Sequence, residues 1–162
     1  IPSNWNIGLA WETSPSSVLT FDIQGINFSE VDSVANSVAQ IQTGNLFGSD
    51  NGPGFGWDDM TVIKLGYQWA SGNDWIWRVG YSHASQPIPE EEVTLNILAP
   101  AVMEDHFTVG FTKAMGSNNE LSMAAMYSPA NSVKGANSFD PAQNVEIEMS
   151  QFDLELSYAW KF

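Results

Sequence analysis

The stretch FDLELSYAWKF, residues 152–162, alternates strictly between large apolar side chains and polar or small ones. The apolar set is Phe152, Leu154, Leu156, Tyr158, Trp160 and Phe162. A period of two predicts a β-strand with one apolar face and one polar face. A soluble protein could bury the apolar face against a core, and a membrane barrel could turn it toward lipid. Taken alone, the stretch leaves both environments open.

Composition restricts the classes of protein. Hydrophobic residues make up 43% of the 162 residues, which is enough for one domain with a sizeable core. No stretch approaches the ~20 apolar residues that a transmembrane helix requires. Nineteen acidic residues against five basic ones give a net charge of −14, and this charge argues against a nucleic-acid partner. The sequence has no cysteine, which excludes disulfides and cysteine-based sites.

Six further segments alternate in the same way. They lie at 5–12, 19–24, 61–69, 75–81, 107–112 and 121–127. With 152–162 they predict an all-β fold of about seven antiparallel, up-and-down strands, each about 8 to 13 residues long. Strands that cross a bilayer at a tilt need roughly 9 to 11 residues.

Short and long connections alternate along the chain. Short turns rich in Ser, Gly, Asn or Pro are predicted at 13–16, 71–73 and 115–119. Long loops are predicted at about 30–57, 84–104 and 129–146, and most of the acidic residues lie in or beside them. This rhythm is typical of an up-and-down barrel with tight turns at one rim and elaborate, acidic loops at the other.

A soluble β-sandwich or a lipocalin-like, lipid-binding barrel would also alternate. Such a protein crowds its outer face with charged residues, whereas the second face here is mostly Gly, Ala, Ser, Thr and Gln. Aromatic residues also gather at the ends of the segments, where the aromatic girdles of a membrane barrel lie. The pattern therefore favours half of a transmembrane β-barrel and keeps the soluble lipid-binding protein as the alternative.

Lys64 and Arg78 are candidate ligand-binding residues, because each falls in the middle of a strand, on the polar face. They could meet the carboxylate of a substrate. They could instead neutralise acidic residues of the same face, since a narrow lumen must balance its own charges. The acidic candidates are Asp22, Asp74, Asp153 and Glu155.

The long loops contain apolar residues that solvent-exposed loops seldom carry. The members that we take as a candidate surface for capturing a hydrophobic molecule are Phe47, Phe55, Leu95, Ile97 and Leu98. Packing of one loop on another would explain the same residues.

No enzyme or cofactor site is expected. The two histidines, His83 and His106, have no spacing that matches a known set of metal ligands. The sequence has no GxSxG nucleophile motif. We therefore expect no catalytic residue, no metal and no cofactor.

Several segments together resemble a known family. They are WNIGLAWE, DIQGINFSEV, GWDDMTVIKLGYQW and the distinctive NILAP, EDH and GF pieces at residues 96–111. In these the chain resembles the FadL and TodX family of outer-membrane transporters for long-chain fatty acids and other hydrophobic compounds. The resemblance runs through all 162 residues and corresponds to the C-terminal half of a family member.

The resemblance implies a place and a role for the chain. Residues 1–162 would form the last seven strands of a fourteen-stranded barrel in the bacterial outer membrane, with the long loops extracellular. The missing N-terminal half, or another copy of the chain, would complete the barrel. Transport would be passive uptake, and outer-membrane lipid would surround the wall. In members of this family, an N-terminal segment called the hatch blocks the lumen and carries an Asn-Pro-Ala motif. Ser128-Pro129-Ala130 departs from that motif, so we transfer no role to it.

Overall fold

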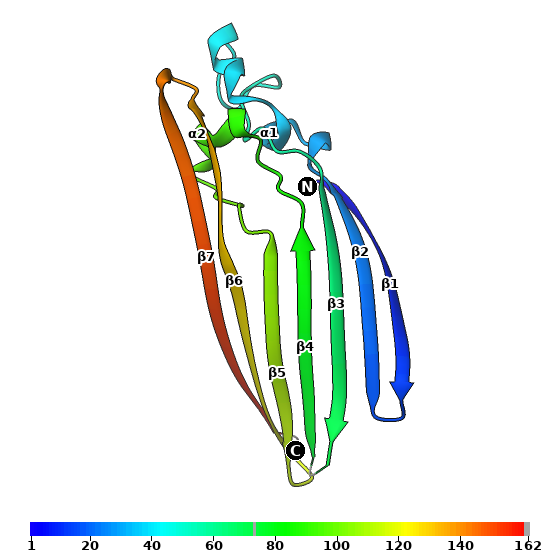
Figure 1. Cartoon of the computed structure of the whole chain (residues 1–162). Helices are drawn as coiled ribbons and strands as arrows, with labels where there is room; N and C mark the ends of the chain where they lie inside the picture. Colours follow the sequence, from blue (N-terminus) through cyan, green and yellow to red (C-terminus); the bar gives the residue numbers. More distant parts are fainter. Residues whose placement is uncertain (73, 161–162) are drawn as a thin grey trace.

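The computed structural model describes residues 1–72 and 74–160, which form one antiparallel sheet. Its strands are β1 (Ser3–Ser14), β2 (Ser17–Asn27), β3 (Met60–Ser71), β4 (Trp75–Ala84), β5 (Asp105–Met115), β6 (Asn119–Asn137) and β7 (Asp140–Trp160). Each strand pairs with the next along the chain, so the predicted seven-stranded, up-and-down fold is confirmed (Figure 1). Among the described residues, β1 and β7 do not pair with each other, and the sheet is open.

The register separates two faces of the sheet. One row of cross-strand partners is apolar on all seven strands, and its side chains are between 38% and 67% exposed. This apolar row comprises Leu9, Phe21, Leu65, Tyr81, Phe107, Tyr127 and Phe152. The next row points to the other face and is mostly small or polar: Ala10, Thr20, Gly66, Gly80, Thr108, Met126 and Asp153. We call the two faces the apolar face and the polar face.

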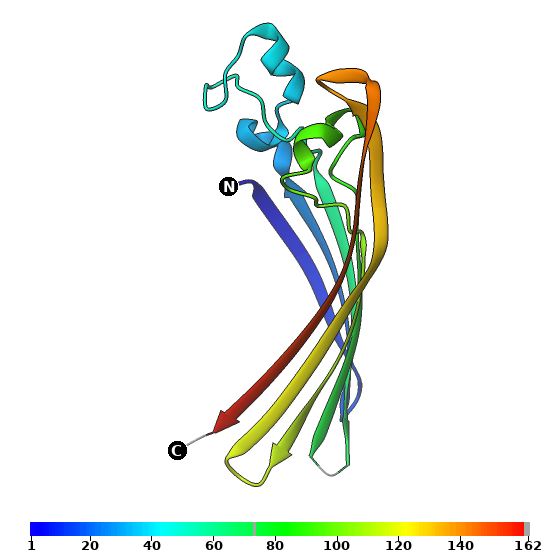
Figure 2. The same cartoon turned by 90° about the vertical axis from the view of Figure 1, so that its left-hand side faces the viewer.

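The sheet is a curved wall with two different ends (Figure 2). Short turns join the strands at one end, which we call the turn end, and the long segments gather at the other, the loop end (Figure 1). The C-terminal strand β7 runs toward the turn end. The predicted terminal residues Lys161 and Phe162, and Asn73 of the predicted turn 71–73, lie outside the described residues.

The two predicted loops at about 30–57 and 84–104 are present and carry short helices. The first loop contains η1 (Phe28–Glu30), α1 (Asp32–Ala35) and η2 (Val38–Thr43). The second contains η3 (Glu90–Glu92) and α2 (Val93–Asn96). In the described chain, no helix is long and apolar enough to cross a membrane.

The prediction of a third long loop at 129–146 is wrong. These residues continue β6 and β7 as a long hairpin, so the two strands have 19 and 21 residues and exceed the predicted lengths. The hairpin is ordered because its inner side has a partner: Val133 and Ile147 pair across it and pack against the second loop. An isolated hairpin of this kind would be marginal without such packing.

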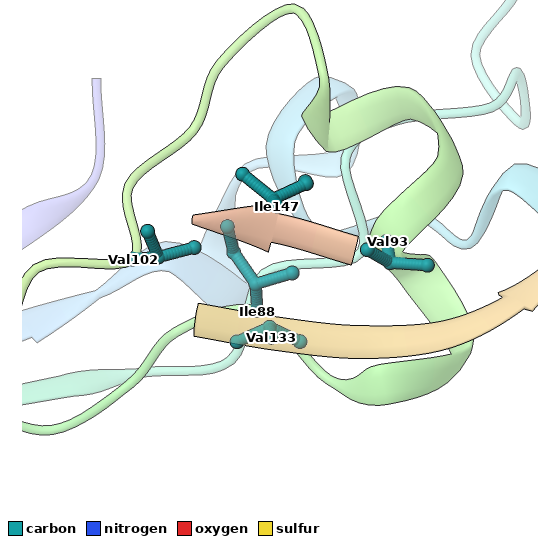
Figure 3. Packing of buried hydrophobic residues seen from close by; sticks show 5 residues of the cluster. All are labelled: Ile88, Val93, Val102, Val133 and Ile147. Atoms are coloured by element: carbon teal, nitrogen blue, oxygen red, sulfur yellow. The ribbon is translucent and has the colours of Figure 1, made fainter. Parts of the chain in front are cut away.

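The hydrophobic core lies at the loop end rather than between two sheets. Figure 3 shows its five buried members from the second loop and the hairpin: Ile88, Val93, Val102, Val133 and Ile147. Val93 and Val102 are fully buried. Close packing is possible because Gly135 of β6 lies against the backbone of Glu90, where a Cβ would collide with the carbonyl oxygen. The core therefore fixes the loop end on top of the wall.

A β-bulge joins the wall to the hairpin. The register of β6 against β7 shifts between Ser128 and Asn131, where Pro129 and Ala130 stand opposite the single residue Ser150. A bulge of one residue shifts the alternation of one strand by one position. Below the bulge, the even-numbered residues of β6 point to the polar face. Above the bulge, odd-numbered residues such as Val133 point to the core.

Candidate functional site

The polar face contains a hollow of about 520 Å³ that crosses β2 to β7. Its floor is made by residues with little or no side chain, namely Gly66, Gly80, Gly110 and Ala124. Threonine side chains fill the space above two of these glycines. A Cβ on Gly66 or on Gly80 would lie 2.6 Å from the hydroxyl oxygen of Thr20 or Thr108, respectively. The hollow thus exists because its floor carries no side chain larger than a methyl group.

Arg78 projects from β4 into this hollow and is held by two neutral groups. Its Nε donates to the amide oxygen of Gln68 at 2.8 Å. Its Nη1 donates to the hydroxyl of Thr112 at 2.9 Å, and this hydroxyl lies 2.9 Å from that of Ser122. Because Gln68 is the register partner of Arg78, the sheet itself positions the guanidinium.

Lys64 lies nearer the loop end and lines an adjoining hollow of about 230 Å³. Its Nζ donates to the amide oxygen of Gln24 at 2.9 Å. The two hollows share Thr20, Gly66, Gly80 and Thr108 in their walls. The structure therefore places both predicted cations along one continuous depression of the polar face.

The predicted neutralisation by Asp22, Asp74, Asp153 or Glu155 is wrong for both cations. In the described part of the chain, no carboxylate forms an ion pair with Lys64 or Arg78. Asp22 is the register partner of Lys64, but its carboxylate accepts from the side-chain amide of Asn6 at 3.3 Å. The cations are bonded by glutamine amides instead: Gln68 stands directly opposite Arg78, and Gln24 stands diagonally opposite Lys64.

Glu155 is a residue of the hollow that the sequence indicated only as a counter-ion. It projects from β7 and lines the same hollow as Arg78. Its carboxylate has no hydrogen bond or ion pair with any described residue. In the sequence, its odd residue number among the polar residues of 152–162 places Glu155 on the polar face. Only the curvature and the strand register of the structure show that it shares a hollow with Arg78.

The loop end divides the predicted capture residues into two groups. Phe47, Ile97 and Leu98 are 65%, 57% and 80% exposed. Leu95 is only partly exposed, and so is Phe55, whose ring packs 6.2 Å from that of Trp57. The alternative of loop packing thus explains part of the set. Leu46, another apolar residue of the first predicted loop, is 76% exposed beside Phe47. The exposed Phe139, in the turn between β6 and β7, was missed.

A buried polar network joins the two loops. The side chain of Asn96 is fully buried, accepts from the indole nitrogen of Trp57 at 2.6 Å and donates to the carbonyl oxygen of Phe55 at 2.7 Å. The buried carboxylate of Glu92 accepts from the backbone N–H of Val38 at 2.9 Å. Buried polar groups are costly unless they are bonded, so this network specifies one arrangement of the loops.

Ser138, at the turn of the hairpin, is bonded to both loops. Its N–H donates to the hydroxyl oxygen of Thr94 in α2 at 2.9 Å. Its carbonyl oxygen accepts from the side-chain amide of Gln42 in η2 at 3.4 Å. All three segments of the loop end are therefore connected above the open side of the wall.

The two histidines lie on different faces. His83 is on the apolar face at the loop end, with its Nδ1 2.9 Å from a carboxylate oxygen of Asp105, which also accepts from the hydroxyl of Tyr81 at 2.6 Å. His106 lines the smaller hollow of the polar face. Within residues 1–72 and 74–160, no three His, Cys, Asp or Glu side chains gather as metal ligands.

Comparison with known proteins supports the fold. No protein-family model matches the sequence, and no curated protein matches it. Two solved structures match the whole chain at 20% identity: the crystal structure of the Pseudomonas putida toluene transporter TodX, with a TM-score of 0.65, and the deltaS2 mutant of the TodX monoaromatic hydrocarbon channel, with a TM-score of 0.67. The chain spans 35% and 36% of the length of those two chains. The resemblance in sequence is thus confirmed for the fold, which is that of part of the TodX barrel.

Proposed function

We propose that residues 1–162 are the C-terminal portion of a transmembrane β-barrel in the bacterial outer membrane, through which hydrophobic compounds enter passively. The observation that carries this proposal is the apolar row, which crosses all seven strands without interruption and is covered by no described residue. Soluble proteins seldom expose a contiguous apolar surface of this extent. Lipid is the environment in which such a face is stable.

Aromatic residues support the same proposal, that the apolar face meets lipid. At the turn end of the apolar face, the rings of Trp75 and Trp77 stack at 5.4 Å, and each lies within 5.4 Å of the ring of Phe111. The ammonium of Lys113 lies 5.1 Å from the centre of the Trp75 ring. Indole rings beside a cation are typical of the level at which a bilayer meets water. This level would be the periplasmic boundary.

The open edges require further strands. Unpaired backbone N–H and C=O groups on β1 and β7 would each cost several kcal/mol in hydrocarbon. We propose that the remaining strands of a longer polypeptide close the barrel, with pairing to another copy of this chain as the alternative. The polar face would then line the lumen, and the loop end would be extracellular.

The proposed substrates are long-chain fatty acids or other hydrophobic compounds such as hydrocarbons. The exposed residues Phe47, Ile97 and Leu98 would capture the molecule from the medium. It would then pass Lys64, in the hollow nearer the loop end, and afterwards Arg78. Either cation could attract a carboxylate, because the partners of both among the described residues are neutral amides and hydroxyls. No catalysis and no cofactor are part of this proposal.

Uptake by intact cells tests the proposal. The full-length polypeptide containing this chain would be expressed in cells without their own hydrophobic-compound transporter, and influx of radiolabelled toluene and oleate would be measured. We expect influx of at least one compound above that of cells with the empty vector. A variant with Phe47, Ile97 and Leu98 all changed to Ser should lower influx at low substrate concentration. Recovery of the polypeptide in the aqueous fraction, with bound lipid, would instead favour the soluble lipid-binding alternative.

A further inference from the structure

We infer that the larger hollow of the polar face is a polar filter that favours uncharged amphipathic molecules over carboxylates, with Arg78 as the donor to the substrate's polar head and Glu155 as the residue that rejects anions. The inference rests on the proposed function and narrows its substrate class. It follows from the two charges that line the hollow, their partners and the row of hydroxyls between them.

Arg78 retains donors for a ligand. A guanidinium has five N–H groups, and Nε and Nη1 each donate to one neutral oxygen of the wall. Nη2 donates to no described residue. Because the two wall bonds fix the plane of the guanidinium, its free edge has a defined direction. A hydroxyl, carbonyl or ether oxygen of a passing molecule is therefore met by an oriented donor.

Glu155 makes this site unlike a simple anion-binding site. Its unpaired carboxylate lines the same hollow, three strand spacings from β4, which is about 14 Å along the sheet before curvature brings the walls nearer. The hollow is thus neutral in sum, with a cation at one wall and an anion at the other. A substrate carboxylate would be attracted by Arg78 and repelled by Glu155, whereas an uncharged head group would gain the hydrogen bond without the repulsion.

Hydroxyl groups continue from Arg78 toward Glu155. Thr112, Ser122 and Ser157 are register partners on β5, β6 and β7, and all three line the hollow. Hydroxyls both donate and accept, so they accommodate a substrate hydroxyl in any orientation. The nearby glycines and Ala124 leave apolar surface for the body of the molecule. A phenol or an alcohol on an apolar body fits these features.

Competing influx of two matched probes tests the inference. The probes p-cresol and p-toluate share a methylphenyl body and differ in having an uncharged or an anionic head at pH 7. Influx of each would be measured in cells that carry the full-length barrel. We expect the wild type to favour p-cresol. Glu155→Gln should lower the cresol-to-toluate ratio by roughly threefold, because the charge that repels the carboxylate is removed from the wall of the hollow. Arg78→Gln should reduce influx of both probes.

Two controls identify the role of the charge at this place. Glu148→Gln removes the same charge from the same strand, outside the hollow, and should leave the ratio unchanged. Glu155→Asp keeps the charge and should keep the wild-type ratio. Equal ratios in the wild type and Glu155→Gln, with both proteins in the outer membrane, would overturn the inference. If neither probe enters above the empty-vector level although toluene or oleate does, the inference also fails. If toluene and oleate do not enter either, the proposed function itself fails.

Discussion

The amide oxygen of Asn96 lies 2.6 Å from the indole nitrogen of Trp57, and this bond joins the second loop to the first across a fully buried side chain. The same amide donates to the carbonyl oxygens of Phe55 and Glu92. One side chain therefore satisfies three polar groups of two loops that are remote in sequence. Ile97 and Leu98, two of the exposed residues of the loop end, follow Asn96 directly in the chain.

We expect Asn96→Ala to loosen the loop end without unfolding the wall. The substitution leaves the Trp57 N–H and the Phe55 carbonyl without their partner, and each unsatisfied buried group costs about 1–3 kcal/mol. Limited proteolysis of the full-length barrel should cut within residues 28–59 much faster than in the wild type. Asn144→Ala, at an exposed site of β7, is the matched control. Equal cleavage rates for both variants would contradict the assignment.

Gly135→Ala tests the close contact between the hairpin and the second loop. A Cβ at this position would collide with the carbonyl oxygen of Glu90, so η3 must shift away from β6. Overpacking of this kind costs about 1–3 kcal/mol. Hydrogen exchange of the Val93–Asn96 amides should accelerate. A Cβ on Gly72 meets no atom within 4 Å, so Gly72→Ala should leave the exchange unchanged; a similar acceleration in both variants would rule out the steric explanation.

Neighbouring substitutions on opposite faces of β5 test the orientation in the membrane. Val109 is 51% exposed on the apolar face, and Thr108 lines the hollow of the polar face. Val109→Lys should destabilise the barrel in lipid by about 2–4 kcal/mol, whereas Thr108→Lys should cost far less, because a lumenal lysine keeps its water. Reversible unfolding in bilayers measures both values. The opposite order would assign the apolar face to the lumen.

The pH dependence of the first loop follows from Asp59. The backbone N–H of Ser29 donates to its carboxylate at 2.9 Å, and this bond, together with the nearby side chain of Ser29, lowers the pKa of the Asp59 carboxyl. A lowered pKa means that the bond stabilises the loop above the usual aspartate pKa of about 3.9 and that this contribution disappears as the pH falls through the lowered value.

The Ser29 amide resonance provides the measurement for Asp59. In the wild type it should titrate with a midpoint below about 3.9, and Asp59→Ala should abolish that titration. Asp58→Ala, which changes the neighbouring carboxylate, should leave the midpoint in place. A Ser29 midpoint at or above the usual value would show that the bond does not form.

Strand alternation was sufficient to predict the wall but not the hairpin above it. In 152–162 and the six similar segments, the period of two is regular because each strand lies in one sheet with an apolar face and a polar face. In β6 the bulge at Pro129 and Ala130 shifts the alternation by one residue, so the pattern breaks although the strand continues. The run Val145, Ile147 and Met149, with glutamates between, carried a usable signal of β7.

The site was predicted less completely than the fold because it depends on contacts between distant strands. Lys64 and Arg78 were found from their charge and mid-strand position. Their partners were predicted as carboxylates, whereas glutamine amides and a hydroxyl hold them. The position of Glu155 in the same hollow as Arg78 could not be predicted, because it follows from the pairing register of four consecutive strands, β4 to β7. Phe139 was missed with the hairpin itself.

The bulge at Pro129 and Ala130 also makes the hairpin a separable module. Below it, the alternation of β6 follows the two faces of the wall. Above it, residues of the hairpin such as Val133 and Ile147 pack against the second loop. Because the one-residue shift resets the phase at a single point, a different hairpin could be grafted above the bulge while the wall keeps its register. If the proposed orientation holds, exchange of this segment between related barrels would alter the surface at the loop end and leave the wall intact.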